Sequence, residues 1–116
     1  MKKILLIDDD ESIQLLYHAE LTDMGYEVAQ AYDGVQGLAI LETFQPDLVI
    51  LDINMPNMNG LEVLRRLKEA HPDLPVLLSS AYHQYKEDFS SWASDAYIVK
   101  SSDMTELKEA VRGFLG

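Results

Sequence analysis

Acidic residues that follow short apolar runs are the groups in this chain best placed to do chemistry. Asp8 and Asp9 follow Ile4–Ile7, and Asp52 follows Leu48–Leu51. Unbroken apolar runs of this length suit strands buried on both faces of a parallel sheet, and the carboxyl ends of such strands meet at one edge. Carboxylates gathered there repel one another and raise each other's pKa unless a cation joins them. The pattern therefore predicts a site for a hard divalent cation, for which magnesium is the natural candidate.

Two further apolar runs end on residues that suit phosphate chemistry. Ser79 and Ser80 follow the run that begins at Val76, and Lys100 follows Ala96–Val99. We assign Ser79 to the strand and Ser80 to the site. A carboxylate can attack phosphorus to give an aspartyl phosphate, while a metal ion and a lysine neutralise the developing charge. Acids, hydroxyls and a lysine at neighbouring strand ends therefore predict a combined metal and phosphate site.

The elements that must position these residues alternate along the chain. Strict alternation of strands and helices predicts a parallel sheet with right-handed crossovers and helices on both faces. We expect an α/β fold with a doubly wound five-stranded parallel sheet of order 2-1-3-4-5, in which neighbouring strands about 4.8 Å apart share one ligand at their ends. The predicted strands are Lys3–Ile7, Glu27–Ala31, Asp47–Leu51, Pro75–Ser79 and Ala96–Val99.

Amphipathic stretches between these runs predict five helices. Asp10 is an acid at the start of the first, where the helix dipole favours it, and Gly25 closes that helix. Asp103 and Glu106 have capping-box spacing at the start of the last. The predicted apolar faces are Ile13, Leu16, Tyr17, Leu21 and Met24; Leu38 and Leu41; Leu61, Leu64 and Leu67; Tyr85, Phe89 and Trp92; and Met104, Leu107, Val111 and Phe114.

Composition limits the classes of protein to consider. The 116 residues suit a single domain, since no linker, repeat or low-complexity segment divides them. The absence of cysteine excludes disulfides, thiol catalysis and cysteine-bound zinc. A formal net charge of −11 argues against nucleic-acid binding through this domain, because phosphate contacts need clustered Lys and Arg. The apolar runs are far shorter than the roughly 18 residues of a membrane span, and we expect a cytoplasmic protein.

These motifs, in this order and spacing, resemble the receiver domains of response regulators, the CheY-like proteins of two-component signalling. The matching segments are Ile4–Asp9, Asp47–Gly60, Ser80-Ala81 and Tyr97–Lys100, and the likeness covers essentially the whole chain. The resemblance implies that residues 1–116 form one receiver domain, a switch phosphorylated by a histidine kinase or a histidine phosphotransfer protein. Such a domain turns over no separate substrate, because it catalyses only phosphoryl transfer to its own aspartate and hydrolysis from it.

The resemblance also assigns roles within the predicted site. Asp52 is the phosphoacceptor, and Lys100 pairs with the phosphoryl oxygens. Asp8 and Asp9 hold Mg²⁺ or Mn²⁺ together with Asp52 and the backbone carbonyl of Asn54. These assignments come from the family and not from the spacing of the residues.

Further residues correspond to the switch of this family. Ser80 hydrogen-bonds the phosphoryl oxygens, and Tyr97 is the aromatic residue that moves inward when Ser80 is recruited. Asn54 and Tyr82 occupy positions that tune the lifetime of the phosphate. The family places downstream partner proteins on the face formed by the fourth helix, fifth strand and fifth helix, where Tyr85–Ser94 is the most distinctive segment.

One departure from the family pattern leaves an alternative function open. Ser101 follows Lys100 where most receiver domains have a proline joined by a cis bond. A cis bond to a non-proline residue costs about 2.5–4 kcal/mol, so the loop is either trans and rearranged or strained. The departure motivates a phosphate-independent interaction module as the alternative. Flavodoxins and haloacid-dehalogenase-type phosphatases fit poorly, since the first loop carries Asp8–Asp10 and Asn54 stands where such a phosphatase needs an acid.

Overall fold

Strands and helices alternate along the chain, as the sequence predicts. The computed structural model describes residues 1–53, 55, 60–80, 95–100 and 103–116. The predicted fourth helix, with its aromatic residues, lies outside this part of the chain. The described elements are β1 (Lys3–Ile7), α1 (Glu11–Asp23), β2 (Glu27–Ala31), α2 (Gly34–Phe44), β3 (Leu48–Asp52), α3 (Gly60–Ala70), β4 (Val76–Ser80), β5 (Ala96–Val99) and α5 (Thr105–Leu115).

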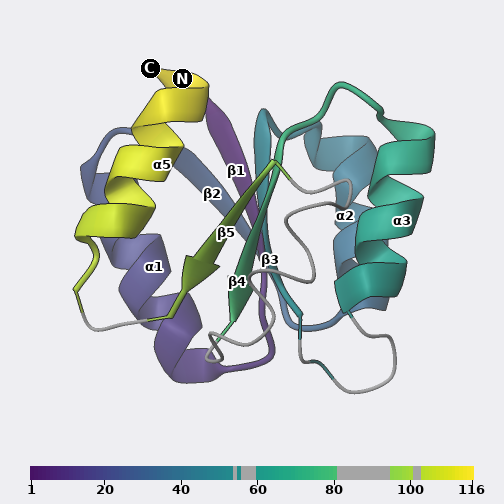
Figure 1. Ribbon diagram of the computed structural model, residues 1–116, viewed down its shortest axis with the longest axis horizontal. Coiled ribbons are helices and arrows are strands. Elements are labelled where there is room, and N and C mark those ends of the chain that lie inside the picture. Colours follow the sequence, from purple (N-terminus) through teal and green to yellow (C-terminus); the bar gives the residue numbers. More distant parts are fainter. Residues whose placement is uncertain (54, 56–59, 81–94, 101–102) are drawn as a thin grey trace.

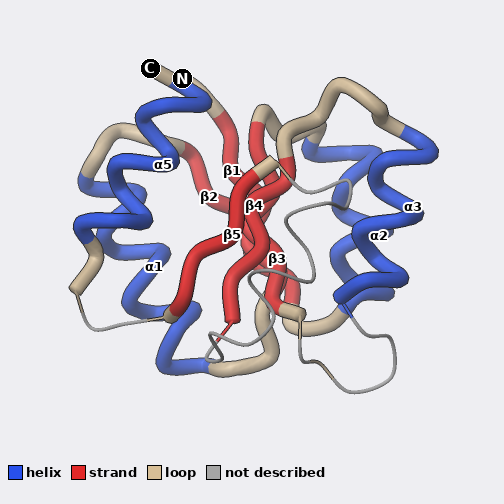
Figure 2. Tube along the Cα trace, in the orientation of Figure 1, coloured by secondary structure: helices blue, strands red, loops and turns tan. Residues whose placement is uncertain are grey.

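All the described strands belong to one parallel sheet of order β2-β1-β3-β4-β5, which confirms the predicted topology. Figure 1 shows α1 and α5 on one face of this sheet and α2 and α3 on the other. Because the strands are parallel, their carboxyl ends share one edge, which is the lower edge in Figure 2. The residues predicted to form the site therefore come to the same end of the molecule.

Strands β3 and β4 begin and end one residue later than the sequence predicts. Asp47 stays outside β3, where its side chain accepts a hydrogen bond from the backbone N–H of Lys3 at 2.8 Å. Pro75 stays outside β4, because proline has no N–H to donate to the ladder. Asp52 and Ser80 are consequently the last residues of strands, which fixes their backbone more firmly than a loop would.

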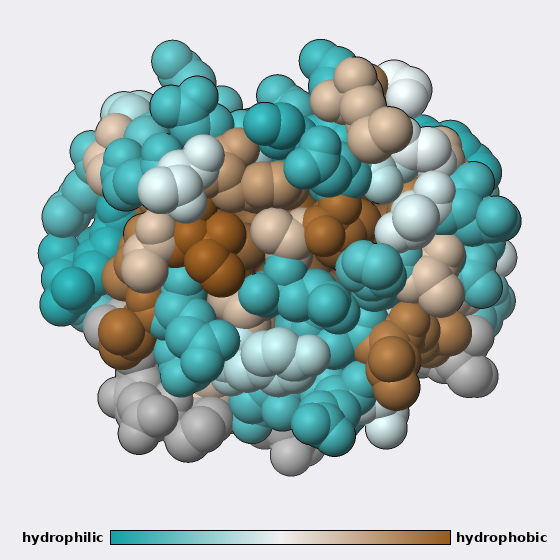
Figure 3. Space-filling view, turned by 180° about the vertical axis from the view of Figure 1, so that it is seen from behind, coloured by the Kyte–Doolittle hydropathy of each residue, from teal (hydrophilic) through white to brown (hydrophobic). Residues whose placement is uncertain are grey.

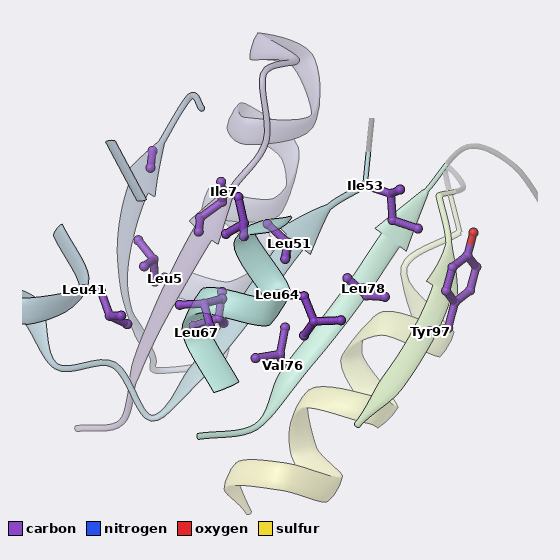
Figure 4. Packing of buried hydrophobic residues seen from close by; sticks show 13 residues of the cluster. Leu5, Ile7, Leu41, Leu51, Ile53, Leu64, Leu67, Val76, Leu78 and Tyr97 are labelled. Atoms are coloured by element: carbon purple, nitrogen blue, oxygen red, sulfur yellow. The ribbon is translucent and has the colours of Figure 1, made fainter. Parts of the chain in front are cut away.

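Two clusters of buried side chains lie between the sheet and its helices, one on each face of the sheet. Successive strand residues contribute alternately to the two clusters, because side chains alternate along a strand. Figure 4 shows the first, here called the α2–α3 cluster. It contains Leu5, Ile7, Val49, Leu51, Val63, Leu64, Leu67, Val76, Leu78 and Tyr97, among others. The second, here called the α1–α5 cluster, includes Ile4, Leu6, Tyr17, Leu21, Leu48, Ile50, Leu77, Ile98, Leu107 and Val111.

Two residues predicted to lie on the apolar faces of helices, Leu16 and Phe114, are exposed instead. Leu16 is 36% exposed, and Gln14 takes the buried place on α1 instead. Phe114, near the end of α5, is 37% exposed. These two predictions were wrong, because a regular period cannot show where a helix leaves the sheet or where a polar side chain finds buried partners.

The predicted helix ends are largely present. Gly25 follows α1 with φ of +98°, the left-handed conformation that glycine adopts without strain. Asp10 is the N-cap of α1 and accepts hydrogen bonds from the N–H groups of Ser12 and Ile13. At α5 the N-cap is Met104, and Asp103 accepts a hydrogen bond from the N–H of Thr105 just ahead of the helix. The helix begins one residue later than predicted, and because Met104 makes no side-chain capping hydrogen bond, the capping box predicted there was wrong.

The surface reflects the acidic composition of the chain. Seen from behind, hydrophilic residues cover most of the molecule and hydrophobic residues gather towards the middle (Figure 3). Twenty acidic residues stand against nine basic ones. Among the described helices, none has the length and apolar character needed to cross a lipid bilayer.

Candidate functional site

Four polar side chains lie in one row on the α1–α5 face of the sheet, at its carboxyl edge. Asp52 and Ser79 are register partners in β3 and β4. Backbone hydrogen bonds extend the ladder beyond β1 and β5, from the N–H of Asp8 to Ala31 and from the N–H of Lys100 to Ser80. Each row residue follows by two positions a member of the α1–α5 cluster, and these members are Leu6, Ile50, Leu77 and Ile98. Because side chains alternate along a strand, Asp8, Asp52, Ser79 and Lys100 share one face, and they are here called the site row.

Three carboxylates gather at one end of the site row. Oxygen atoms of Asp8, Asp9 and Asp52 all lie within 4.8 Å of one another. Asp8 is 1% exposed and Asp52 3% exposed, whereas Asp9 is open to solvent. A set of closely spaced carboxylate oxygens with one side open to water fits a hard divalent cation such as Mg²⁺, which keeps several water ligands. Asn54, whose carbonyl the family resemblance adds to this set, lies outside the described residues.

Lys100 supplies a positive charge to the buried acids. Its Nζ lies 2.7 Å from Asp8 Oδ2 and 3.4 Å from Asp52 Oδ1, and its side chain is 14% exposed. Burial alone would lower the pKa of Lys100, but the two carboxylates raise it above its ordinary value. Burial raises the pKa of Asp8, although the ammonium and the N–H of Asp10 act in the opposite sense. The Lys100 ammonium thus lies beside the Asp8 carboxylate, where a bound divalent metal ion would also lie.

A buried glutamine fixes the backbone beneath Asp8. Gln14 Nε2 donates hydrogen bonds to the carbonyl oxygens of Leu6, Asp8 and Ala31 at 3.3, 3.0 and 2.8 Å. The N–H of Asp10 also donates to Asp8 Oδ1 at 2.9 Å. The sequence gives one weak signal for this role, a polar residue at a helix position that faces the sheet. Gln14 therefore joins the ends of β1 and β2 and holds the first metal-ligand candidate in place.

Ser80 and Tyr97 lie on the other face of the sheet from the site row. Ser80 is fully buried at the end of β4, and it follows Val76 and Leu78 of the α2–α3 cluster at intervals of two. Tyr97 belongs to the same cluster, and Figure 4 shows its side chain on β5, the edge strand of the sheet. The structure thus brings the two predicted switch residues to one face. Tyr82 and the Lys100–Ser101 bond lie outside the described part of the chain.

The fold agrees with a comparison against known families. A family model described as the response regulator receiver domain matches residues 4–112. The chain belongs to this family. The order of the strands is the one that the resemblance implied.

Solved structures and sequence relatives of this receiver domain include chains of similar length and longer proteins. The response regulator TrrA of Thermotoga maritima, solved with Mg(2+)-BeF, is 43% identical over 98% of this chain and 99% of its own, with a TM-score of 0.93. TrrA in complex with the histidine kinase ThkA gives a TM-score of 0.92, at 43% identity and full coverage of both chains. Sporulation initiation phosphotransferase F of Bacillus subtilis is 32% identical over 98% of this chain and 94% of its own length. The regulator RpaA of Synechocystis is 39% identical over 99% of this chain. RpaA is a longer protein, and this chain covers 49% of its length.

Proposed function

We propose that this receiver domain is a phosphorylation-dependent signalling switch in which Asp52 accepts a phosphoryl group from a histidine kinase or a histidine phosphotransfer protein. The observation that carries the proposal is the proximity of Asp52 both to two other carboxylates and to the Lys100 ammonium. The complex of TrrA with the kinase ThkA supports a kinase as the donor. Residues 1–116 act as one receiver domain, and the switch operates in the cytoplasm.

The transfer reaction needs a nucleophile and charge neutralisation, and the chain supplies both. A carboxylate oxygen of Asp52 attacks the phosphorus of a phosphohistidine, a P–O bond forms, and the P–N bond breaks with departure of the imidazole. Lys100 lies close enough to Asp52 to pair with the phosphoryl oxygens after a small side-chain movement. Asp8, Asp9, Asp52 and the Asn54 carbonyl would hold Mg²⁺ or Mn²⁺, which when bound would supply further neutralisation of charge on those oxygens. Turnover is confined to the aspartyl phosphate of the protein itself.

Phosphorylation changes the conformation through Ser80 and Tyr97. The Ser80 hydroxyl donates a hydrogen bond to a phosphoryl oxygen, and Tyr97, which lies on the same face of the sheet, repacks in response. Hydrogen bonds to a charged group contribute about 1.5–3 kcal/mol each, so Ser80 and Lys100 together supply about 3–6 kcal/mol. A change from 1:99 to 99:1 between two states takes about 5.5 kcal/mol, and the switch is therefore close to its threshold. Replacement of Ser80 by Ala is expected to leave phosphorylation intact and to reduce the shift of Tyr97 signals in NMR spectra.

Other residues of the domain set the lifetime of the phosphate and bind the downstream partner. Asn54 and Tyr82 tune hydrolysis, and variants at these positions are expected to change the dephosphorylation rate more than the fold. A downstream protein binds β5, α5 and the segment Tyr85–Ser94, which lies outside the described residues. Titration of phosphorylated and unphosphorylated protein with a cognate partner would measure this coupling.

Intact mass after incubation with Mg²⁺ and acetyl phosphate tests the proposed function. We expect one added phosphoryl group on the wild-type protein, and none on Asp52→Asn or in the presence of chelator. No added mass together with tight binding of Mg²⁺ and beryllofluoride would indicate a very short-lived phosphate. No added mass and no beryllofluoride binding would refute the proposal and favour a phosphate-independent interaction module.

A further inference from the structure

Ser79 belongs to the site row, yet the proposed function gives it no task. It is 0% exposed, and β4 lies between β3, which carries Asp52, and β5, which leads to Lys100. Its Oγ makes no hydrogen bond of good geometry with any residue in the described part of the chain. A buried hydroxyl without a partner costs about 1–3 kcal/mol, so it calls for a physical explanation.

A second hydroxyl lies against Ser79 from the helix side. Tyr17 projects from α1 into the α1–α5 cluster and is 1% exposed. Burial raises the pKa of Tyr17, while the neighbouring hydroxyl of Ser79 and the charge of Lys100 act in the opposite sense. The phenol therefore adjoins both the unsatisfied hydroxyl and the charged groups of the site, although its other neighbours in the cluster are largely aliphatic.

The Lys100 side chain must cross β4 to reach Asp8. The strands run β1-β3-β4-β5, so three inter-strand spacings of about 4.8 Å separate the two ends of the site row. Lys100 nevertheless places Nζ 2.7 Å from Asp8, so its side chain extends over the strand that carries Ser79. An ammonium has three N–H donors, and a serine hydroxyl can accept one of them while hydrogen-bonding a phenol.

We propose that Ser79 and Tyr17 are positioning residues whose hydroxyls provide a second binding position for the Lys100 ammonium, used when Asp8 binds a cation. The inference rests on the proposed metal and phosphate site. The Lys100 ammonium and a bound metal ion both favour the Asp8 carboxylate. When the metal ion displaces the ammonium, the ammonium needs another hydrogen-bond acceptor, because its surroundings are buried. Ser79 lies on the path back from Asp8 towards β5, and Tyr17 completes the hydrogen-bonding capacity of Ser79. The hydroxyl pair thus keeps Lys100 beside Asp52, where it is needed for phosphoryl transfer.

Affinity for Mg²⁺, measured by titration calorimetry without any phosphodonor, tests this inference. Ser79→Val and Ser79→Thr have nearly the same shape, and only the threonine variant keeps a hydroxyl. We expect roughly tenfold weaker Mg²⁺ binding in Ser79→Val and Tyr17→Phe, because the displaced ammonium loses a charge-assisted hydrogen bond, and rescue in Ser79→Thr. Tyr26→Phe is the matched control, since the Tyr26 hydroxyl donates to Gly116 at the other end of the sheet.

A spectroscopic signature on the folded wild-type protein provides an independent measurement. The carbon-13 shift of the Tyr17 ring carbon that bears the hydroxyl is expected to move on addition of Mg²⁺, and not to move in Lys100→Met. Equal Mg²⁺ affinities of Ser79→Val and Ser79→Thr, or equal Tyr17 shifts with and without Lys100, would overturn the inference. A wild-type protein that bound no Mg²⁺ would overturn it together with the metal site. Absence of both phosphoryl addition and beryllofluoride binding, while Mg²⁺ binds as expected, would refute only the proposed function.

Discussion

Loss of the Lys100 ammonium is expected to destabilise the domain, and Lys100→Met is the variant that removes it at similar size. The ammonium lies 2.7 Å from Asp8 and 3.4 Å from Asp52. At an effective dielectric constant of about 20, these contacts correspond to attractions of about 6 and about 5 kcal/mol before desolvation is counted. Removal of one partner of a buried ion pair costs about 3–5 kcal/mol. We expect Lys100→Met to lower the free energy of unfolding by about 3 kcal/mol, the lower end of this range, because Asp8 can take up a proton instead.

The size of this loss depends on pH in a defined direction. Burial already raises the pKa of Asp8 in the folded protein, and removal of the ammonium raises it further. A carboxyl group with a raised folded pKa contributes stability that is fully present below its unfolded value of about 3.9 and lost as pH rises through the folded value. The deficit of Lys100→Met relative to wild type is therefore largest above the folded pKa of Asp8, and it shrinks as the pH falls towards the unfolded value.

Urea unfolding in chelator and in Mg²⁺, at about pH 8 and at about pH 5, which is nearer the unfolded pKa of Asp8, measures both effects. A ligand at roughly 100 times its Kd stabilises the folded state by about 2.7 kcal/mol. Mg²⁺ should stabilise Lys100→Met more than wild type, since no ammonium competes for Asp8. Lys108→Met is the control, because the Lys108–Glu20 pair is partly exposed and such pairs contribute at most about 1 kcal/mol. Equal losses in the two variants, or a Lys100→Met deficit that Mg²⁺ leaves unchanged, would refute the reasoning.

Glycine positions provide two further predictions. In Gly60→Ala the new Cβ would lie 2.5 Å from the Cα of Ile53 and 2.6 Å from the carbonyl oxygen of Asp52, so we expect a loss of about 1–3 kcal/mol in urea unfolding and weaker Mg²⁺ binding. Gly113→Ala, in an open part of α5, is the control and should gain about 0.5–1 kcal/mol. Gly25→Ala meets no atom but keeps a φ of +98°, and it should cost about 1–2 kcal/mol without affecting Mg²⁺ affinity; unchanged stability would contradict the backbone argument.

The sheet and most of the site row follow from the sequence, because apolar runs that end on polar residues specify both. Asp8, Asp52 and Lys100 each stand directly after such a run, and parallel strands can only bring their ends to one edge. The order of strands then decides which ends are neighbours. This part of the prediction depends on few assumptions beyond strand identity, and small errors in strand boundaries did not affect it.

Other features depend on which face a residue occupies, and a run of apolar residues cannot show this. Ser79 and Ser80 are adjacent and chemically alike, yet the register with β3 places Ser79 in the site row and alternation places Ser80 on the Tyr97 side. Gln14 is polar, but buried carbonyl oxygens at the ends of β1 and β2 satisfy its amide, so it is buried and Leu16 is exposed. Such choices depend on partners that are distant in the sequence.

The position of the phosphoryl group on the chain decides whether Asp52 is the phosphoacceptor. The protein would be phosphorylated with acetyl phosphate in Mg²⁺, reduced with borohydride, which converts an aspartyl phosphate to homoserine, and digested for peptide sequencing by mass spectrometry. We expect homoserine at position 52 alone, with unmodified Asp8 and Asp9. Conversion at Asp8, at Asp9 or elsewhere in the chain, with Asp52 unchanged, would contradict it.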